Sequence, residues 1–248
     1  MEQIVEGVRR LLPYSMQRVL PFLQAAHETA DQEETKVPDE PVKLAPGLHK
    51  APRRYFHALA KALPEVPPEI ILRILDEAGL YTRYVTARLP SCSILQHTNY
   101  TVVARTPRLS SYGVSSLRSI TFRFSSHDQG FSGEPAQFHG TFEHSHTWFE
   151  AAVTENMTAE RLQPPPVQRL DIQHNRHASR QFEEYEVTFA IGEKPFEHLA
   201  EGQGIVLLAC ALYPAWRNVV EWAEIELAWV DTFDEGQPPY FLDGDLPV

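Results

Sequence analysis

The stretch SSHDQGFSG, residues 125–133, follows a strand-like run and gathers residue types that bind polar ligands. His127, Asp128 and Gln129 carry hydrogen-bond donors and acceptors on short side chains, and Phe131 offers a flat apolar face. The two glycines of the stretch permit backbone angles that other residues rarely adopt. This pattern favours a recognition loop for a sugar or a polar peptide. In the alternative interpretation, Asp128 fixes the turn by bonding backbone amides and Gln129 ties it to a neighbouring strand.

Further residues complete the predicted ligand-binding set. If the stretch is a recognition loop, its polar side chains should lie near aromatic or polar partners at one end of the domain. The partners that we expect are Trp148, Asn175, His177 and Trp216. Trp216 also fits a second role, because a tryptophan in a turn between two strands often closes one end of a core.

The segment HSHTWFE contains a rival signal. His144, His146 and Glu150 would share one face if the whole segment were a strand, and two imidazoles with a carboxylate can bind a metal ion. Their spacing resembles the first motif of the cupins, which implies a metal-dependent enzyme as the alternative function. The sequence has no Gly-x-Ser-x-Gly, no phosphate-binding loop and no dinucleotide fingerprint. We therefore predict a binding module rather than an enzyme, with no cofactor.

The candidate residues lie in a β-rich part of the chain. From Ile94 onward, apolar residues alternate with polar ones in runs separated by Gly, Pro, Ser and Asp, as in RSITFRF, where Ile120, Phe122 and Phe124 share one face. The pattern predicts an antiparallel β-sandwich or jelly roll of the galactose-binding-like type. We place this domain at residues 91–234 and a tail at 235–248.

The first third of the chain is predicted to be helical, with one interruption. Apolar spacing indicates short helices within residues 1–26 and a helical segment at 54–90. Residues 27–53 are rich in acidic residues and proline and have few large apolar side chains, so they are predicted to form a flexible linker.

The strongest helix signal lies in LPEVPPEIILRILDEAG, residues 63–79. Proline suits the first turn, an aliphatic stripe follows, and Gly79 suits the position after the helix. The stretch resembles the opening of an F-box. That resemblance implies a substrate-recognition component of an SCF-type ubiquitin ligase that binds a Skp1-like adaptor through Pro68, Ile70, Ile71, Ile74 and Leu75. The alternative is that this stripe contacts the protein's own domain.

A wider resemblance covers most of the chain. The stretches SSHDQGFSG, GTFEHSHTWFEAAV, NRHAS and LYPAWRNVVEWAEIEL resemble a family of uncharacterised fungal proteins in which an F-box-like helix precedes a β-sandwich. The resemblance implies that the sandwich recognises a protein or glycan target.

Composition excludes several classes. The 248 residues carry a formal net charge of -11, so a broad nucleic-acid-binding surface is not expected. No apolar run is long enough to cross a membrane, and the two cysteines are too few for a disulfide framework. We expect a cytoplasmic or nuclear protein.

Overall fold

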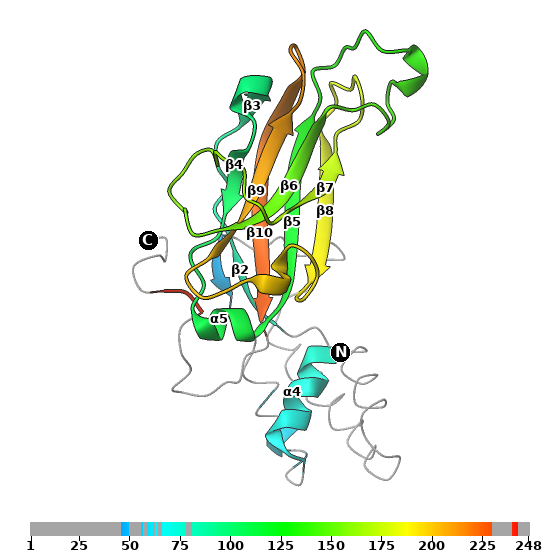
Figure 1. Ribbon diagram of the computed structural model, residues 1–248. Coiled ribbons are helices and arrows are strands. Elements are labelled where there is room, and N and C mark those ends of the chain that lie inside the picture. Colours follow the sequence, from blue (N-terminus) through cyan, green and yellow to red (C-terminus); the bar gives the residue numbers. More distant parts are fainter. Residues whose placement is uncertain are drawn as a thin grey trace. The chain divides into compact units, whose positions relative to one another are not determined.

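The computed structural model describes the β-rich part of the chain almost completely (Figure 1). The described residues are 46–49, 56, 59–61, 63, 66–77, 81–229 and 240–242. The predicted helices at 1–26, most of the linker at 27–53 and most of the tail at 235–248 lie outside these residues. The chain divides into two compact units, one comprising residues 1–83 and 229–237, the other 84–228 and 238–248.

The first unit contains the predicted amphipathic helix. Helix α4, Pro68–Glu77, begins at a proline whose missing N–H costs nothing in a first turn, and the acidic Glu69 follows. Ile71, Ile74 and Leu75 are buried within the chain. Three of the five predicted adaptor contacts are therefore already covered, whereas Pro68 is exposed and Ile70 partly so. A three-residue strand, β1 (Gly47–His49), lies in the predicted linker.

The second unit is an antiparallel β-sandwich, which confirms the predicted fold class. In the first sheet the strand order is β2-β10-β5-β8, and β3 also pairs with β10; in the second it is β4-β9-β6-β7. The strands of the first sheet are β2 (Thr82–Val85), β3 (Cys92–Leu95), β5 (Leu117–His127), β8 (Glu183–Ala190) and β10 (Arg217–Trp229). Those of the second are β4 (Thr101–Arg105), β6 (Thr147–Thr154), β7 (Arg169–His174) and β9 (Gly204–Ala211). Short helices α5 (Ser111–Ser115), η2 (Gln96–Thr98), η3 (Ala136–Phe138) and η4 (Phe196–His198) lie in the connections.

The core lies between the two sheets. Ile120, Phe122 and Phe124 of β5 are fully buried, as their alternation predicts. Phe124 contacts Phe149 of β6 with ring centroids 4.1 Å apart, so aromatic packing joins one sheet to the other. Cys210 of β9 is also buried, in agreement with its place in an apolar run.

The other face of the first sheet carries a network of ion pairs. Arg123 of β5 lies 2.7 Å from Glu186 of β8 and 2.9 Å from Glu226 of β10, measured between nitrogen and oxygen. Arg88 lies 2.9 Å from Glu224 and also covers the ring of Trp222 at 4.0 Å. Glu224 and Glu226 of β10 are nearly buried by these contacts.

The strand boundaries differ from the sequence prediction in three places. The segment HSHTWFE is a strand only from Thr147 onward, since His144 has a left-handed φ of 56° and the chain before Thr147 turns. Strand β7 escaped prediction because its sequence RLDIQH is mostly polar, as an edge strand allows. Strand β2 lies inside the predicted helical segment 54–90. Among the described helices, none is long and apolar enough to cross a membrane.

The ion-pair network leads to a test of stability. Arg123→Met removes the ion pairs of Arg123 with two nearly buried glutamates, and we expect the free energy of unfolding to fall by about 1 to 3 kcal/mol. Glu186→Gln is the matched control, because Glu186 is exposed and an exposed pair contributes about 0 to 1 kcal/mol. Urea unfolding measures both, and equal effects of the two substitutions would refute the burial argument.

Candidate functional site

Three loops meet at one end of the sandwich, at the top of Figure 1. They connect β5 to β6 (residues 128–146), β7 to β8 (175–182) and β9 to β10 (212–216). Backbone hydrogen bonds join them in pairs. The bonds run from Gly140 N to His177 O at 2.8 Å, from His177 N to Thr141 O at 2.7 Å, and from Leu212 N to His146 O at 2.9 Å.

Two buried asparagines hold the base of these loops. Asn175 and Asn218 are fully buried, and Asn175 Nδ2 donates to Asn218 Oδ1 at 3.0 Å. Asn175 Nδ2 also donates to Thr147 Oγ1, and Asn175 Oδ1 accepts from Ser126 Oγ at 2.6 Å. Asn218 Nδ2 donates to the carbonyl oxygens of Trp148 and Cys210 at 3.1 and 3.3 Å.

This buried amide pair connects both sheets to the loop after β7. Every polar group of both side-chain amides has a partner, so the pair carries no burial penalty for unmet hydrogen bonds. Asn175 was predicted to bind ligand. The structure instead gives it a structural role, because its polar atoms are buried and fully used inside the protein.

Asp128 is a further buried polar residue at this end. Its Oδ2 accepts from the backbone N–H of Ala178 at 2.9 Å and so fastens the β7–β8 loop to the end of β5. Burial raises the pKa of Asp128 from 3.8 to about 6, and the backbone amides of Ala178, Gln129 and Gly130 only partly oppose this rise. Asp128 therefore fits the alternative interpretation, in which it bonds backbone amides and fixes the turn. The difference is that one of these amides belongs to another loop, β7–β8.

Gln129 joins the β5–β6 loop to the β9–β10 hairpin. Its Nε2 donates to the carbonyl of Phe131 at 2.7 Å, and its Oε1 accepts from the backbone N–H of Arg217 at 3.1 Å. His127 contacts the carbonyl oxygen of Asp128 through Nδ1, and its ring meets the ring of Phe182 edge to face at 4.5 Å. The side-chain amide of Gln129 therefore has a structural role: it holds the β5–β6 loop against the start of β10.

A cleft of about 430 Å³ opens between these elements. It is lined by His127, Gln129, Phe131, Arg180, Ala215, Arg217 and Val219. Three predicted ligand-binding residues are therefore brought together at one hollow, and the ring of Phe131 is 58% exposed there. The prediction missed both arginines, although Arg180 directly follows NRHAS and Arg217 lies within LYPAWRNVV, two stretches already singled out.

The backbone around the cleft is strained. Ala178 and Ala215 have left-handed φ values of 57° and 71°, which non-glycine residues adopt at a cost of about 1 to 3 kcal/mol. Gly130 has a left-handed φ of 80°, which favours glycine at this position, whereas Gly133 has open space around it and no such φ. Strained positions of this kind concentrate at ligand-binding sites, where the surrounding structure holds them in place.

The remaining predicted ligand-binding residues lie elsewhere. His177 is fully buried, with Nδ1 2.9 Å from the carbonyl oxygen of His144. Trp216 meets the rings of His146 and His177 edge to face at 4.8 and 5.2 Å, which fits the interpretation that it closes the end of the core. Trp148 stacks on His174 at 6.0 Å and does not line the cleft.

The alternative metal site, built from His144, His146 and Glu150, does not have the geometry that it requires. His144 and His146 precede β6, so they do not continue the face of Glu150. The Glu150 carboxylate accepts from Trp148 Nε1 at 2.9 Å and pairs with Arg169 at 2.8 Å. In the part of the chain that the structure describes, which includes all three residues, no cluster of His, Cys, Asp or Glu is arranged to hold a metal ion.

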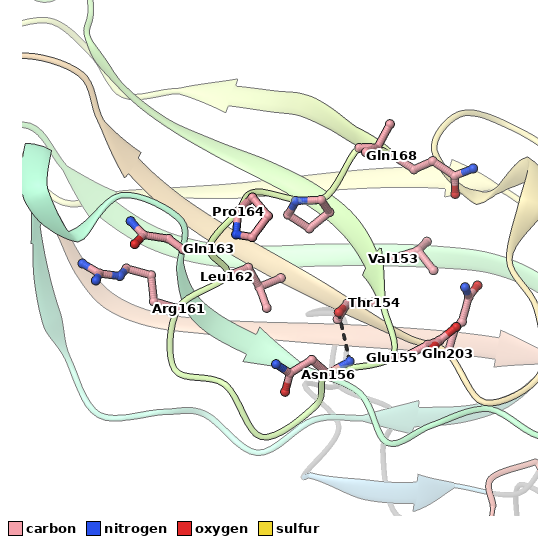
Figure 2. A pocket seen from close by; sticks show the side chains of 12 residues that line it. Val153, Thr154, Glu155, Asn156, Arg161, Leu162, Gln163, Pro164, Gln168 and Gln203 are labelled. Carbon is pink, nitrogen blue, oxygen red and sulfur yellow. Dashed lines mark hydrogen bonds between the residues drawn. The ribbon is translucent and has the colours of Figure 1, made fainter.

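A second hollow of about 640 Å³ lies beside the loop after β6 (Figure 2). Its wall combines the end of β6, the proline-rich segment around Pro164 and the side chain of Gln203. Asn156 N donates to Thr154 Oγ1 at 3.1 Å, the bond drawn in Figure 2. None of these residues was predicted to bind a ligand, and among the described residues the hollow shares no lining residue with the cleft.

The comparisons with known proteins provide no family. No protein-family model matches the sequence, and no curated protein gives a significant match. The resemblance to fungal F-box-like proteins, and the adaptor binding that it implies, stay predictions.

The amide pair predicts a large effect from a small truncation. Asn175→Ala leaves Asn218 Oδ1 and two buried hydroxyls without the partner they now have, so the free energy of unfolding should fall by about 1 to 3 kcal/mol. Gln137→Ala, at an exposed residue of the β5–β6 loop, serves as the control and should change it by less than about 0.5 kcal/mol. Chemical denaturation that gives equal values for both would contradict the assigned role.

The raised pKa of Asp128 predicts a pH dependence. Between about pH 4 and pH 6 the folded state binds a proton that the unfolded state has released, so the contribution of this group to stability falls as the pH rises. Wild type should lose roughly 2 to 3 kcal/mol relative to Asp128→Asn between pH 4 and pH 7. Urea unfolding of both proteins at a series of pH values checks this, and a difference that stays constant with pH argues against a raised pKa.

Proposed function

We propose that the β-sandwich is a non-enzymatic binding module that recognises its ligand at the three-loop end. The observation that carries the proposal is the cleft lined by His127, Gln129 and Phe131, with the exposed ring of Phe131 at its edge. The ligand class that the sequence suggested, a protein or glycan target, belongs to this proposal.

The distribution of exposed apolar side chains supports the position of the site. Most of the large hydrophobic residues that are exposed in the described part of the chain belong to the three loops: Phe131, Phe142, Phe182, Leu212 and Tyr213. Aromatic side chains gathered on loops of a rigid scaffold mark a contact surface, because exposed apolar patches are costly unless a partner covers them. Glycans and peptides both bind surfaces that combine aromatic faces with fixed polar groups.

The rigidity of the loop end also supports recognition. Asp128 fastens the β7–β8 loop, Gln129 fastens the β9–β10 hairpin, and the buried pair of Asn175 and Asn218 anchors both sheets beneath them. A surface that is already ordered loses little conformational entropy when a ligand binds. The polar residues predicted to touch ligand thus contribute in another way, by holding the contact surface in shape.

Binding of the full chain to glycan and peptide arrays tests this function. We expect wild type to bind a defined subset of the array and Phe131→Ser to weaken that binding about tenfold, since truncation of a central aromatic contact commonly costs more than 1 kcal/mol. The melting temperature should stay unchanged, because the Phe131 side chain is mostly exposed.

Val167→Ser is the matched control. Val167 is 98% exposed and lines the second hollow, so its replacement removes an exposed apolar side chain outside the three loops. Absence of wild-type binding, or equal losses from the two substitutions, would rule out recognition at the three-loop end.

A further inference from the structure

We propose that the cleft binds a small ligand in which an oxyanion, a carboxylate or a phosphate, is attached to a flat apolar group. Arg180 and Arg217 would bind the oxyanion and Phe131 would cover the apolar part. This inference rests on the proposed function, since it names the ligand chemistry of the same cleft.

The charges at the cleft carry the argument. Arg180 and Arg217 both line it, and among the described residues neither guanidinium makes a hydrogen bond or an ion pair. No acidic residue of the described part of the chain lines the cleft either, although the protein has 33 acidic against 22 basic side chains. Two like charges that share one hollow repel each other, so the site is electrostatically complementary to an anion.

Arginines elsewhere in the sandwich show the contrast. Arg88, Arg123, Arg169 and Arg176 each lie within 3 Å of a glutamate oxygen, with nitrogen-to-oxygen distances of 2.9, 2.7, 2.8 and 2.7 Å. Acidic partners are therefore common on this surface. The two cleft arginines differ in that their guanidinium groups stay available to an external ligand.

Both arginines are held at the cleft by features that do not depend on their charge. A Cβ atom at Gly130 would lie 1.8 Å from Arg180 Cγ, so the missing side chain at Gly130 is what lets the stem of Arg180 cross the loop. Arg217 is fixed through its backbone N–H, which donates to Gln129 Oε1. Gly130 thus serves to place a cation.

The remaining lining fits the other half of the ligand. Phe131, Val219 and Ala215 supply apolar surface, and the cleft volume of about 430 Å³ lies in the range of small-molecule sites, about 300 to 1,000 Å³. A guanidinium binds a carboxylate or phosphate through two parallel hydrogen bonds, which fixes the orientation of the ligand as well as its charge. The His127 ring adds a further polar group to the lining. Its Nδ1 must donate to the carbonyl of Asp128, so Nε2 is the ring nitrogen that this bond does not use.

Ligand-observed NMR titration of the full chain tests the inference with four probes. Phenyl phosphate and benzoate carry the two oxyanions on a ring, benzamide is the neutral analogue, and inorganic phosphate lacks the ring. We expect one or both ring anions to bind with a Kd in the millimolar range or below, with benzamide and inorganic phosphate at least tenfold weaker. The ratio between phenyl phosphate and benzoate identifies the preferred oxyanion.

Arg180→Gln and Arg217→Gln should each raise the Kd of the preferred ring anion at least tenfold. Arg180→Lys keeps the charge and loses the paired hydrogen bonds, so it should fall between wild type and Arg180→Gln. Arg161→Gln, which removes an exposed arginine at the second hollow, should leave the Kd unchanged. Melting curves of all variants confirm that each one is folded.

Three results would overturn the inference: no binding of either ring anion to wild type, benzamide binding as tightly as benzoate, or an unchanged Kd in both glutamine variants. The array experiment separates this failure from failure of the binding function. If the array signal depends on Phe131 but survives in Arg180→Gln and Arg217→Gln, the cleft is a recognition site for an uncharged ligand. If neither assay detects binding at the three-loop end, both proposals fail.

Discussion

A hydrogen-bonded pair of buried amides is the constraint on which the loop end depends. Asn175 and Asn218 contact each other where the last strand of one sheet passes the loop that leaves the other sheet. A buried amide without partners destabilises a fold, so this pair is favourable only when Ser126, Thr147 and the backbone of β6 and β9 are all in register. Hydrophobic packing brings the two sheets together but is non-directional, so it does not fix how they are aligned. The hydrogen bonds of the amide pair are directional; they fix this alignment and thereby where the loops begin.

The same principle extends from the amide pair to the cleft. Asp128 accepts from a backbone N–H of the β7–β8 loop and Gln129 from the backbone N–H at the start of β10, and these bonds hold Arg180 and Arg217 on opposite chain segments around one hollow. The arrangement separates two kinds of residue. Buried polar side chains hold the loops in place, while the exposed ring of Phe131 and the two guanidinium groups face solvent and remain available for a ligand.

Much of the sandwich was predictable because strand alternation is a local property. Apolar residues at every second position are typical of β5, β8 and β10, a continuous apolar run is typical of β9, and the fully buried rings of Phe122 and Phe124 follow from the alternation in β5. Predictions failed where local and tertiary preferences differ. The stretch before Thr147 alternates like a strand but turns at a left-handed His144, and β7 is too polar to stand out although pairing with β6 orders it.

For the candidate site, local sequence indicated which segment of the chain lines the cleft. A histidine, a glutamine and an aromatic ring at the end of a strand do form part of a cleft, because strand ends lead into exposed loops whatever the fold around them. Tertiary structure alone decided the roles. Asn175 bonds Asn218 instead of facing solvent, and Arg217 lines an open cleft instead of pairing with a glutamate. Both outcomes depend on residues dozens of positions away in the chain. Hydrogen bonds and ion pairs act over a few ångströms in space, and only the folded chain brings such partners within that distance.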